Sequence, residues 1–323
     1  MVARDSTNTS RPVADVPAET LSSLIRIDVS ALSHTGHHRA NNEDHYLVVR
    51  LGRTLQTVST SLPPGDVPER TEEVNHVMIV ADGMGGHRAG EIASRMAITT
   101  LVGLALDVPD WIFRMDDAHA QEIERRSRSR VQEVDAMLVE SGQRDRSLTG
   151  MGTTLTAARS LGRDLVITHV GDSRAYLLRG GGLLRLTRDH TFAQLLVDAG
   201  QLAPDDVAGS PHRHVLTNAL GGSSADVQVD TDRLQLDDGD RVLLCSDGLT
   251  DLVDDESIAS ILLDTTRSSD ACERLVQRAL DAGGRDNVTV IVAAYHIPED
   301  ARGNSGLKTT STGRAADETT SGG

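Results

Sequence analysis

The sequence is poor in aromatic residues and in positive charge, and both shortages exclude a class of protein. One Trp, three Tyr and two Phe among 323 residues leave too few rings for a surface that stacks single-stranded nucleic acid. The 48 acidic residues outnumber the 32 basic ones, which gives a net charge of −16 and argues against binding to a phosphate backbone. We therefore expect no nucleic-acid partner.

Cysteine and long apolar runs are also scarce. Cys245 and Cys272 are the only cysteines, too few for a disulfide framework, and both lie in apolar stretches that predict burial. No run approaches the roughly 18 apolar residues of a membrane helix, and residues 1–20 lack the apolar core of a signal peptide. We expect a protein without a membrane span, located in the reducing cytoplasm.

Both ends of the chain have the composition of tails. The first residues mix Pro, Ser, Thr and charge without periodicity, and 13 of the 23 residues over 301–323 are Ser, Thr or Gly. Such composition is typical of chain that buries little apolar surface. The sequence predicts a flexible segment over 1–25, one domain over 26–298 and a disordered tail over 299–323.

Between the tails, strand-like and helix-like runs alternate. Hydrophobic patterning predicts strands over 47–51, 74–81, 165–170, 174–179, 183–186, 234–236, 241–246 and 288–295, and helices over 90–106, 118–142, 255–264 and 269–282. We expect the strands of 165–186 to form successive hairpins, another hairpin around Asp238-Gly239, and a loop over 53–73. This order fits an α+β fold of antiparallel sheets flanked by helices better than a doubly wound fold.

Acidic residues stand at the ends of the expected strands. Such positions converge in space, and converging carboxylates repel one another unless a cation compensates. Oxygen ligands suit Mg²⁺ or Mn²⁺, and no His/Cys cluster has the spacing of a zinc site. The sequence therefore predicts a site for hard divalent cations, built from Glu43, Asp44, Asp82, Asp172, Asp247 and Asp286.

The dipeptide Asp-Gly is also the commonest hairpin turn, and Asp238-Gly239 is expected to be only that. Asp82-Gly83 differs, because four glycines fall within residues 82–91 and the run leads directly into a helix. Such glycines permit close approach of the backbone. A phosphate cradle is the alternative, but the loop lacks both GxGxxG spacing and a Walker lysine.

Six segments extend this interpretation to a family, because they occur in one order over about residues 30–297. They are GHHRANNEDHY (36–46), VADGMGGHRAGEIAS (80–94), MGTTLTA (151–157), HVGDSRAYLLRGGGLLRLTRDHT (169–191), LLCSDGLTDLV (243–253) and GGRDNVTVIVA (283–293). Together they make the chain resemble the PPM family of metal-dependent Ser/Thr protein phosphatases, the protein phosphatases of type 2C, in its bacterial form.

The resemblance implies a four-layer α-β-β-α sandwich, with two antiparallel sheets flanked by helix pairs. It implies two Mn²⁺ or Mg²⁺ ions, with a third in some members, and a mobile flap over about 191–222. By this resemblance, Asp82 bridges both metals, and Asp247 and Asp286 bind the first. The Gly83 carbonyl binds the second metal, and Glu43 reaches it through a water. Asp172 helps to bind the third metal, and Arg39 binds the substrate phosphate.

The implied activity is hydrolysis of phosphoserine and phosphothreonine in proteins by a metal-activated water, opposing a Ser/Thr kinase. Met84 stands where animal members carry a histidine thought to protonate the leaving group, so a metal-bound water, His87 and His190 remain candidates for that acid. Two interpretations remain for the basic run over 212–214: it attracts phosphopeptides, or it is a solvated loop. The alternatives are a phosphatase for another phosphoester, and an inactive scaffold that binds phosphoproteins.

Overall fold

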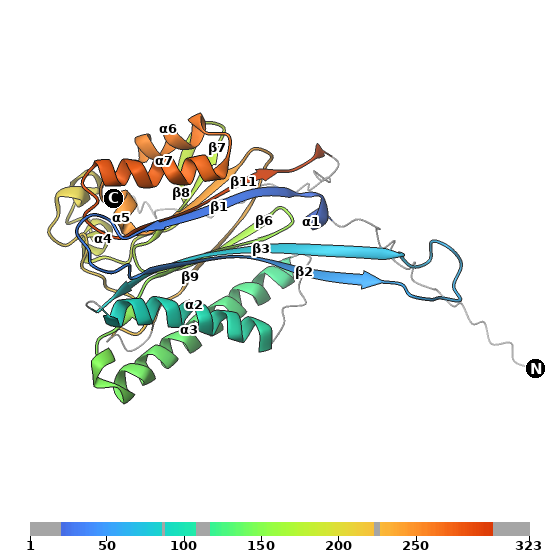
Figure 1. The fold of residues 1–323 in the computed structure, drawn as a ribbon, viewed down its shortest axis with the longest axis horizontal. Helices are drawn as coiled ribbons and strands as arrows, with labels where there is room; N and C mark the ends of the chain where they lie inside the picture. The colour runs from blue at the N-terminus through green and yellow to red at the C-terminus, as the bar shows by residue number, and fades with distance from the viewer. Residues whose placement is uncertain (1–20, 86–87, 108–116, 223–226, 300–323) are drawn as a thin grey trace, which may run out of the picture.

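The computed structural model describes residues 21–85, 88–107, 117–222 and 227–299, which form two antiparallel sheets packed face to face (Figure 1). The first sheet has the order β1 (Arg26–His34), β11 (Val288–His296), β10 (Arg241–Cys245), β7 (Arg174–Arg179) and β8 (Gly182–Arg185). The second has the order β2 (Asp44–Gln56), β3 (Arg70–Met84), β5 (Leu155–Leu161), β6 (Asp164–Val170) and β9 (Asp230–Gln235), and β4 (Gly152–Thr153) pairs with β3.

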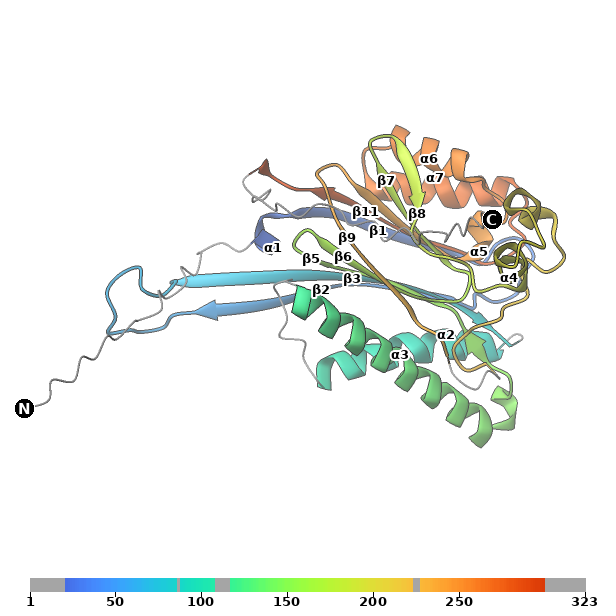
Figure 2. The ribbon, with the colours of Figure 1, turned by 180° about the vertical axis from the view of Figure 1, so that it is seen from behind.

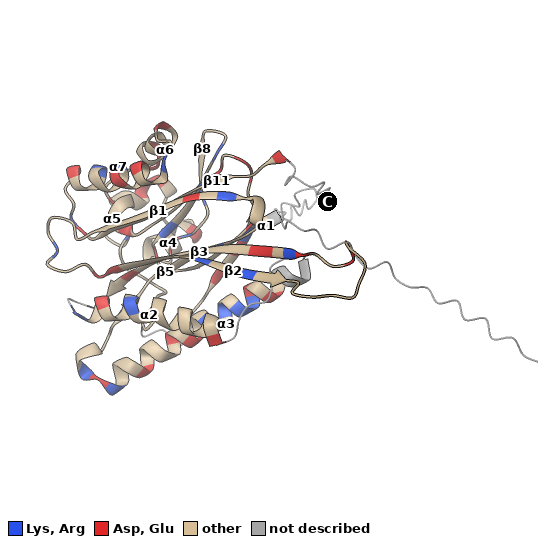
Figure 3. Ribbon diagram, turned by 45° about the vertical axis from the view of Figure 1, so that its right-hand side comes forward, with Lys and Arg blue, Asp and Glu red and all other residues tan. Residues whose placement is uncertain are grey.

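A pair of helices covers the outer face of each sheet. The pair α6 (Asp255–Asp264) and α7 (Ser268–Asp281) lies on the first sheet, and α2 (Arg88–Asp107) and α3 (Asp117–Arg144) lie on the second (Figure 2). The outer surfaces of α3 and α7 carry charges of both signs (Figure 3). This arrangement confirms the predicted four-layer sandwich. The short elements are α1 (Leu21–Leu24), α4 (Phe192–Asp198), α5 (Asp247–Thr250), η1 (Arg146–Leu148) and η2 (Pro204–Gly209).

The central strands build the layers because their two faces are both apolar. In β10, Leu243 and Cys245 pack against the helices, whereas Val242 and Leu244 pack against the opposite sheet. Successive side chains of a strand point to opposite faces, so one strand contributes to two hydrophobic clusters. Every residue of β6 and β10 is buried, which explains why these strands lack an alternating polar pattern.

Two expected hairpins are wrong. The strands β6 and β7 belong to different sheets, and so do β9 and β10. The turn at Gly171-Asp172-Ser173 and the turn at Asp238-Gly239 therefore carry the chain from one sheet to the other. Only the expected pairing of β7 with β8 is confirmed. Local turn residues predict a reversal of direction, but not which sheet receives the next strand, because both sheets present apolar faces.

The strands β2 and β3 are longer than predicted. Their pairing runs from Asp44↔Asp82 to Gln56↔Arg70, so residues 53–56 and 70–73, the two ends of the loop expected over 53–73, are regular strand. The patterning also missed β1 and β5. At the N-terminal end, residues 21–25 were assigned to the flexible segment, yet Ser22 and Ile25 are buried. The Ser22 hydroxyl accepts a hydrogen bond from the Val74 N–H at 3.1 Å.

Among the described residues, α2 is the one helix long and apolar enough to cross a membrane. One face of it, with Ala93, Ala97 and Ile98, is buried in the cluster that joins α2 and α3 to the second sheet. This packing accounts for the apolar composition of α2 as that of a core helix.

Candidate active site

The predicted acidic residues converge at one end of the sandwich. Asp82 lies near the end of β3, Asp172 in the crossover from β6 to β7, Asp247 at the start of α5, and Asp286 just before β11. All four line a single cavity of about 530 Å³, together with Glu43. Sequence positions that span more than two hundred residues are thus brought together, because the strands that carry them end at the same edge.

Two glycines in this cavity are required by close packing rather than by turn geometry. A Cβ atom at Gly83 would lie 2.1 Å from the Gly90 carbonyl oxygen, and one at Gly248 would lie 1.9 Å from the Asn287 carbonyl oxygen. Neither glycine has a positive φ. Each therefore lets another segment approach the aspartate that precedes it, and this requirement separates Asp82-Gly83 and Asp247-Gly248 from the turn at Asp238-Gly239.

The backbone of Asp82 is held on both sides by Thr154. The Asp82 N–H donates to the Thr154 hydroxyl at 3.0 Å, and the Thr154 N–H donates to the Asp82 carbonyl at 2.9 Å. The same hydroxyl lies 2.8 Å from the Ser173 hydroxyl, next to Asp172. Thr154 and Ser173 thereby link the backbone of Asp82 to the turn that carries Asp172.

Burial and mutual repulsion make this group of carboxylates hard to ionise. Burial, then the negative charges of Asp44, Asp247 and other neighbours, raises the pKa of Asp82 well above its usual value. Asp247 shows the same direction for the same reasons. Burial also raises the pKa of Asp172 to about 7. A bound cation would reverse these shifts by stabilising the charged forms.

The loop before β2 is ordered by Asn287, a residue without a predicted role. Its side-chain amide donates to the carbonyls of Thr35 and Asn41, and its side-chain oxygen accepts from the Glu43 N–H at 2.7 Å. The Glu43 carbonyl in turn accepts from the Ser94 hydroxyl at 2.5 Å. These bonds place Glu43 against the start of α2, where its carboxylate faces the cavity with Gly83.

Arg39 lies at the rim of the cavity, with its side chain 53% exposed. Its Nη2 donates to Oδ2 of Asp286 at 2.5 Å, and this hydrogen bond raises the pKa of the guanidinium. The group therefore stays charged and projects between the acidic residues and solvent. Its partner, Asp286, is itself a predicted site residue.

Asp44 belongs to the acidic residues predicted for the cation site, although the family resemblance assigned it to no particular metal. Asp44 is buried and accepts from the Ser246 hydroxyl at 2.7 Å. Its other oxygen, Oδ1, has no hydrogen-bond partner among the described residues, and burial raises its pKa to about 6. Its position beside Asp82 in the pairing of β2 with β3 was not visible from the sequence, which gave no register for these strands.

Asp251 was not predicted from the sequence. Asp251 follows Asp247 by four residues, and this spacing places both side chains on one face of a helical turn. Donor atoms of His214, Asp247 and Asp251 lie within 4.8 Å of one another, with His214 Nδ1 3.4 Å from Asp251. Of the basic run over 212–214, His214 and Arg213 line the cavity, whereas His212 packs edge-on against Phe192.

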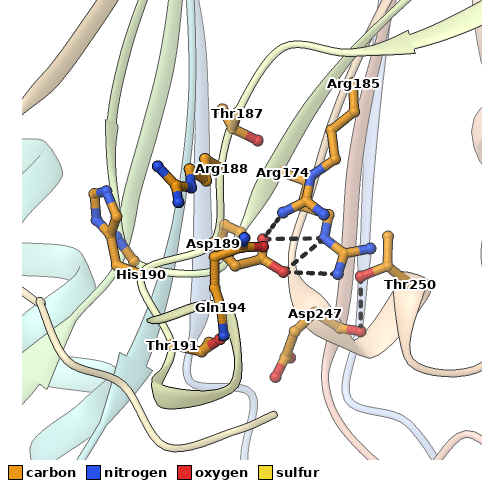
Figure 4. Close-up of polar contacts among 12 residues, drawn as sticks. Arg174, Arg185, Thr187, Arg188, Asp189, His190, Thr191, Gln194, Asp247 and Thr250 are labelled. Carbon is orange, nitrogen blue, oxygen red and sulfur yellow. Dashed lines mark hydrogen bonds and ion pairs between the residues drawn. The ribbon is translucent and has the colours of Figure 1, made fainter. Parts of the chain in front are cut away.

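Beneath the site, a buried ion cluster supports the crossover that carries Asp172. Asp189 accepts hydrogen bonds from Arg174, at 2.7 Å for Nη2, and from Arg185 (Figure 4). Burial opposes the ionisation of Asp189, yet these guanidinium groups hold its pKa below its usual value. Asp189 thus stays charged in the protein interior and fixes Arg174, two residues after Asp172.

The described cavity lining contains neither of the two histidines predicted as candidate proton donors, His87 and His190. His87 lies outside the described residues. Met84 lines the cavity and has no proton to transfer. His190 is absent from the described lining of the cavity, and both of its ring nitrogens have partners elsewhere, at Gly171 and Asp230.

Comparison with known proteins assigns this fold and site to a family. The family model for protein phosphatase 2C matches residues 67–282. The serine/threonine protein phosphatase PstP of Mycobacterium tuberculosis is 40% identical over 219 residues, which cover 67% of this chain and 40% of that protein. The protein phosphatase PhpP of Streptococcus pneumoniae is 34% identical over 285 residues, which cover 85% of this chain and 100% of that protein.

A solved structure of the catalytic domain of PstP in complex with two manganese ions is similar, with a TM-score of 0.64 and 33% identity. The similarity covers 84% of this chain and 99% of that one. The chain belongs to the protein phosphatase 2C family, whose members are metal-dependent serine/threonine phosphatases. It spans less than half the length of the M. tuberculosis relative.

Proposed function

We propose that this protein hydrolyses phosphoserine and phosphothreonine in proteins, through the domain over residues 26–298. The observation that carries the proposal is the convergence of Asp82, Asp172, Asp247 and Asp286 on one cavity. Their raised pKa values describe carboxylates placed where a negative charge is unstable without a cation. Family membership and the two manganese ions of the PstP structure support the same activity.

The residues fit two divalent cations. Carboxylate and carbonyl oxygens are the donors that Mg²⁺ and Mn²⁺ prefer, and the buried Oδ1 of Asp44 is a further oxygen beside them. In the proposed assignment, Asp82 would contribute to both ions and Asp247 and Asp286 would hold the first. The Gly83 carbonyl and Glu43 (through a water) would hold the second, and Asp172 would hold a third. We propose Mn²⁺ or Mg²⁺ for the first two positions.

The bound cations would neutralise the phosphate and lower the pKa of the attacking water. The chain itself supplies orientation and charge. The backbone of Asp82 is fixed through Thr154, which holds this residue in the lining of the cavity. Arg39 is planar and permanently charged, and it suits bidentate contact with two phosphate oxygens. Because Arg39 is exposed at the rim, its guanidinium can leave Asp286 and bind the substrate phosphate instead.

The departing seryl or threonyl oxygen needs a proton, or charge stabilisation in its place. His87 is the donor that the sequence suggests, and Met84 cannot take this part. The flap over 191–222 contributes Arg213 and His214 to the cavity wall. Arg213 and His214 line the same cavity as the carboxylates. In an otherwise acidic protein, they would attract a phosphorylated polypeptide to this cavity.

The proposed setting is the cytoplasm, and the proposed partners are phosphorylated proteins together with a Ser/Thr kinase that phosphorylates them. The relatives PstP and PhpP are bacterial protein phosphatases by name. The proposal specifies the phosphorylated residue type rather than a particular substrate.

The test compares phosphothreonyl, phosphoseryl and phosphotyrosyl peptides of one sequence with p-nitrophenyl phosphate, all with saturating Mn²⁺. We expect turnover of the first two peptides to exceed that of the phosphotyrosyl peptide. Replacement Asp82→Ala should abolish turnover, while Asp205→Ala, on the exposed part of the flap, should not change it. Preference for phosphotyrosine or for the small ester would favour a different phosphatase, and binding without any turnover would favour an inactive scaffold.

A further inference from the structure

His190 stands where the flap leaves the body of the protein. The residue before it, Asp189, is anchored by Arg174 and Arg185 (Figure 4). The residue after it, Thr191, is the N-cap of α4, and its hydroxyl accepts from the Gln194 N–H. The His190 side chain is 14% exposed, and its ring packs at a tilt against that of His169, with the ring centroids 4.9 Å apart. Its position is thus fixed from both sides along the chain.

On the side of the active site, His190 is joined to Gly171 by two hydrogen bonds. Its backbone N–H donates to the Gly171 carbonyl at 2.7 Å, and the Gly171 N–H donates to His190 Nδ1 at 3.1 Å. Gly171 has a φ of +108°, and a Cβ atom there would lie 2.6 Å from Thr154. The residue before Asp172 is therefore held between His190 and the threonine that holds Asp82.

On the side of the flap, the same histidine receives the returning chain. Its carbonyl accepts from the Thr217 N–H at 2.9 Å, and the Asn218 side-chain amide lies 2.9 Å from Nδ1. The Asn218 amide also donates to the Gln228 carbonyl at 2.7 Å. The flap consequently begins and ends on one residue, which also contacts the crossover beside Asp172.

The hydrogen-bond donors around the ring define its form. Nδ1 faces the N–H groups of Gly171 and Asn218, so it acts as an acceptor, and Nε2 carries the hydrogen toward Asp230 at 3.0 Å. Neither nitrogen is directed to a substrate. We propose that His190 is a positioning residue, which couples the placement of the flap to the placement of Asp172, and that it is not the catalytic acid.

The proposal rests on the proposed function only for its kinetic part, so the first test uses metal-free protein. Hydrogen exchange should be measured on the native chain and on His190→Ala. Loss of one or two hydrogen bonds should speed exchange at Gly171 and over 191–218 by about tenfold, with the core strands unchanged. Unchanged exchange in both segments would overturn the proposal whether or not the protein is a phosphatase.

Two conservative variants separate this role from simple packing. An asparagine oxygen reaches the position of Nδ1, whereas a glutamine amide reaches that of Nε2. We therefore expect His190→Asn to restore slow exchange and His190→Gln not to restore it. If glutamine restores it and asparagine does not, the contact with Gly171 is not the one that matters. Should His190→Ala fail to fold, Asn218→Ala is expected to release the flap's return end alone.

The kinetic test compares two substrates of different size. In His190→Ala with saturating Mn²⁺, KM for a phosphothreonyl peptide should rise about tenfold, because the flap wall is displaced. Turnover of p-nitrophenyl phosphate should change less than about twofold. An unchanged KM for the peptide would contradict the positioning role. Loss of activity on both substrates that His190→Asn does not restore would point to His190 as a catalytic group.

Discussion

The side-chain oxygen of Asn287 accepts a hydrogen bond from the backbone N–H of Glu43 at 2.7 Å, across 244 positions of sequence. The backbone carbonyl of the same Asn287 lies against Gly248, where a Cβ atom would come within 1.9 Å. One asparagine therefore joins the loop of Glu43 to the turn of Asp247. The acidic centre depends on close backbone contacts as much as on its carboxylates.

The first prediction concerns this contact. Gly248→Ala should destabilise the protein by about 1–3 kcal/mol and weaken Mn²⁺ binding, because Asp247 must move with its neighbour. Gly103→Ala is the matched control, since a Cβ atom at Gly103 on α2 meets nothing within 4 Å and alanine favours helix by up to about 1 kcal/mol. Thermal unfolding and calorimetric titration with Mn²⁺ measure both effects. Equal behaviour of the two variants would refute the close-packing argument.

The second prediction concerns the buried cluster under the site. Asp189→Asn leaves Arg174 and Arg185 without their carboxylate, and breaking a buried pair costs about 3–5 kcal/mol. The matched control is Asp264→Asn, which removes an exposed partner of Arg274 and should change stability by less than about 1 kcal/mol. Urea unfolding gives both values. A small effect for Asp189 would mean that the cluster does not support the crossover of Asp172.

The third prediction concerns pH. The pKa of Asp44 is raised to about 6 and that of Asp172 to about 7, so the folded, metal-free protein holds protons that the unfolded chain releases near pH 4. Stability from these groups is present at low pH and is lost as pH rises through about 4 to 7. Metal-free protein should thus melt at higher temperature near pH 5 than near pH 7.5.

Bound Mn²⁺ should flatten or reverse this dependence, since the cation stabilises the ionised carboxylates. Asp44→Asn removes one of the titrating groups, and it should reduce the pH dependence of the metal-free protein. Scanning calorimetry with chelator and with Mn²⁺ makes the comparison. A melting temperature of the metal-free protein that climbs steadily from pH 5 to pH 7.5 would go against the proposed electrostatics.

The fourth prediction concerns Arg39. Its bond to Asp286 is largely exposed, so Arg39→Ala should leave stability within about 1 kcal/mol while raising KM for a phosphothreonyl peptide. Arg39→Lys keeps the charge but loses the bidentate geometry, and it should recover only part of the loss. Steady-state kinetics on the peptide compare KM of the native protein, Arg39→Ala and Arg39→Lys. Full recovery by lysine would show that charge alone is used.

The sequence supports the family, the layers and the positions of the acidic residues, because these depend on local patterns. Asp82 and Asp247 could be singled out since each ends an apolar strand and precedes a glycine. The sheet that a strand joins could not be predicted. The strands β6 and β10 are buried along their whole length, so no polar face indicates which sheet lies beside them, and the crossovers at Asp172 and Asp238 were taken for hairpins.

Other parts of the site depend on contacts between distant segments. Asn287 has no local signal that distinguishes it from an ordinary polar residue, and the strand-end position of Asp44 does not show that it lies beside Asp82. Their importance follows from register, which sets Asp44 opposite Asp82, and from the loop that Asn287 bonds. Asp251 could have been found, because it lies one helical turn after Asp247.

Chelation followed by metal restoration tests the central claim most directly. Turnover of a phosphothreonyl peptide would be measured on the purified chain as prepared, after exhaustive removal of divalent ions, and after return of Mn²⁺. The account predicts that activity disappears on chelation and returns with the metal in the native protein, but does not return in Asp82→Ala. Turnover that persists in the fully chelated native protein would contradict it.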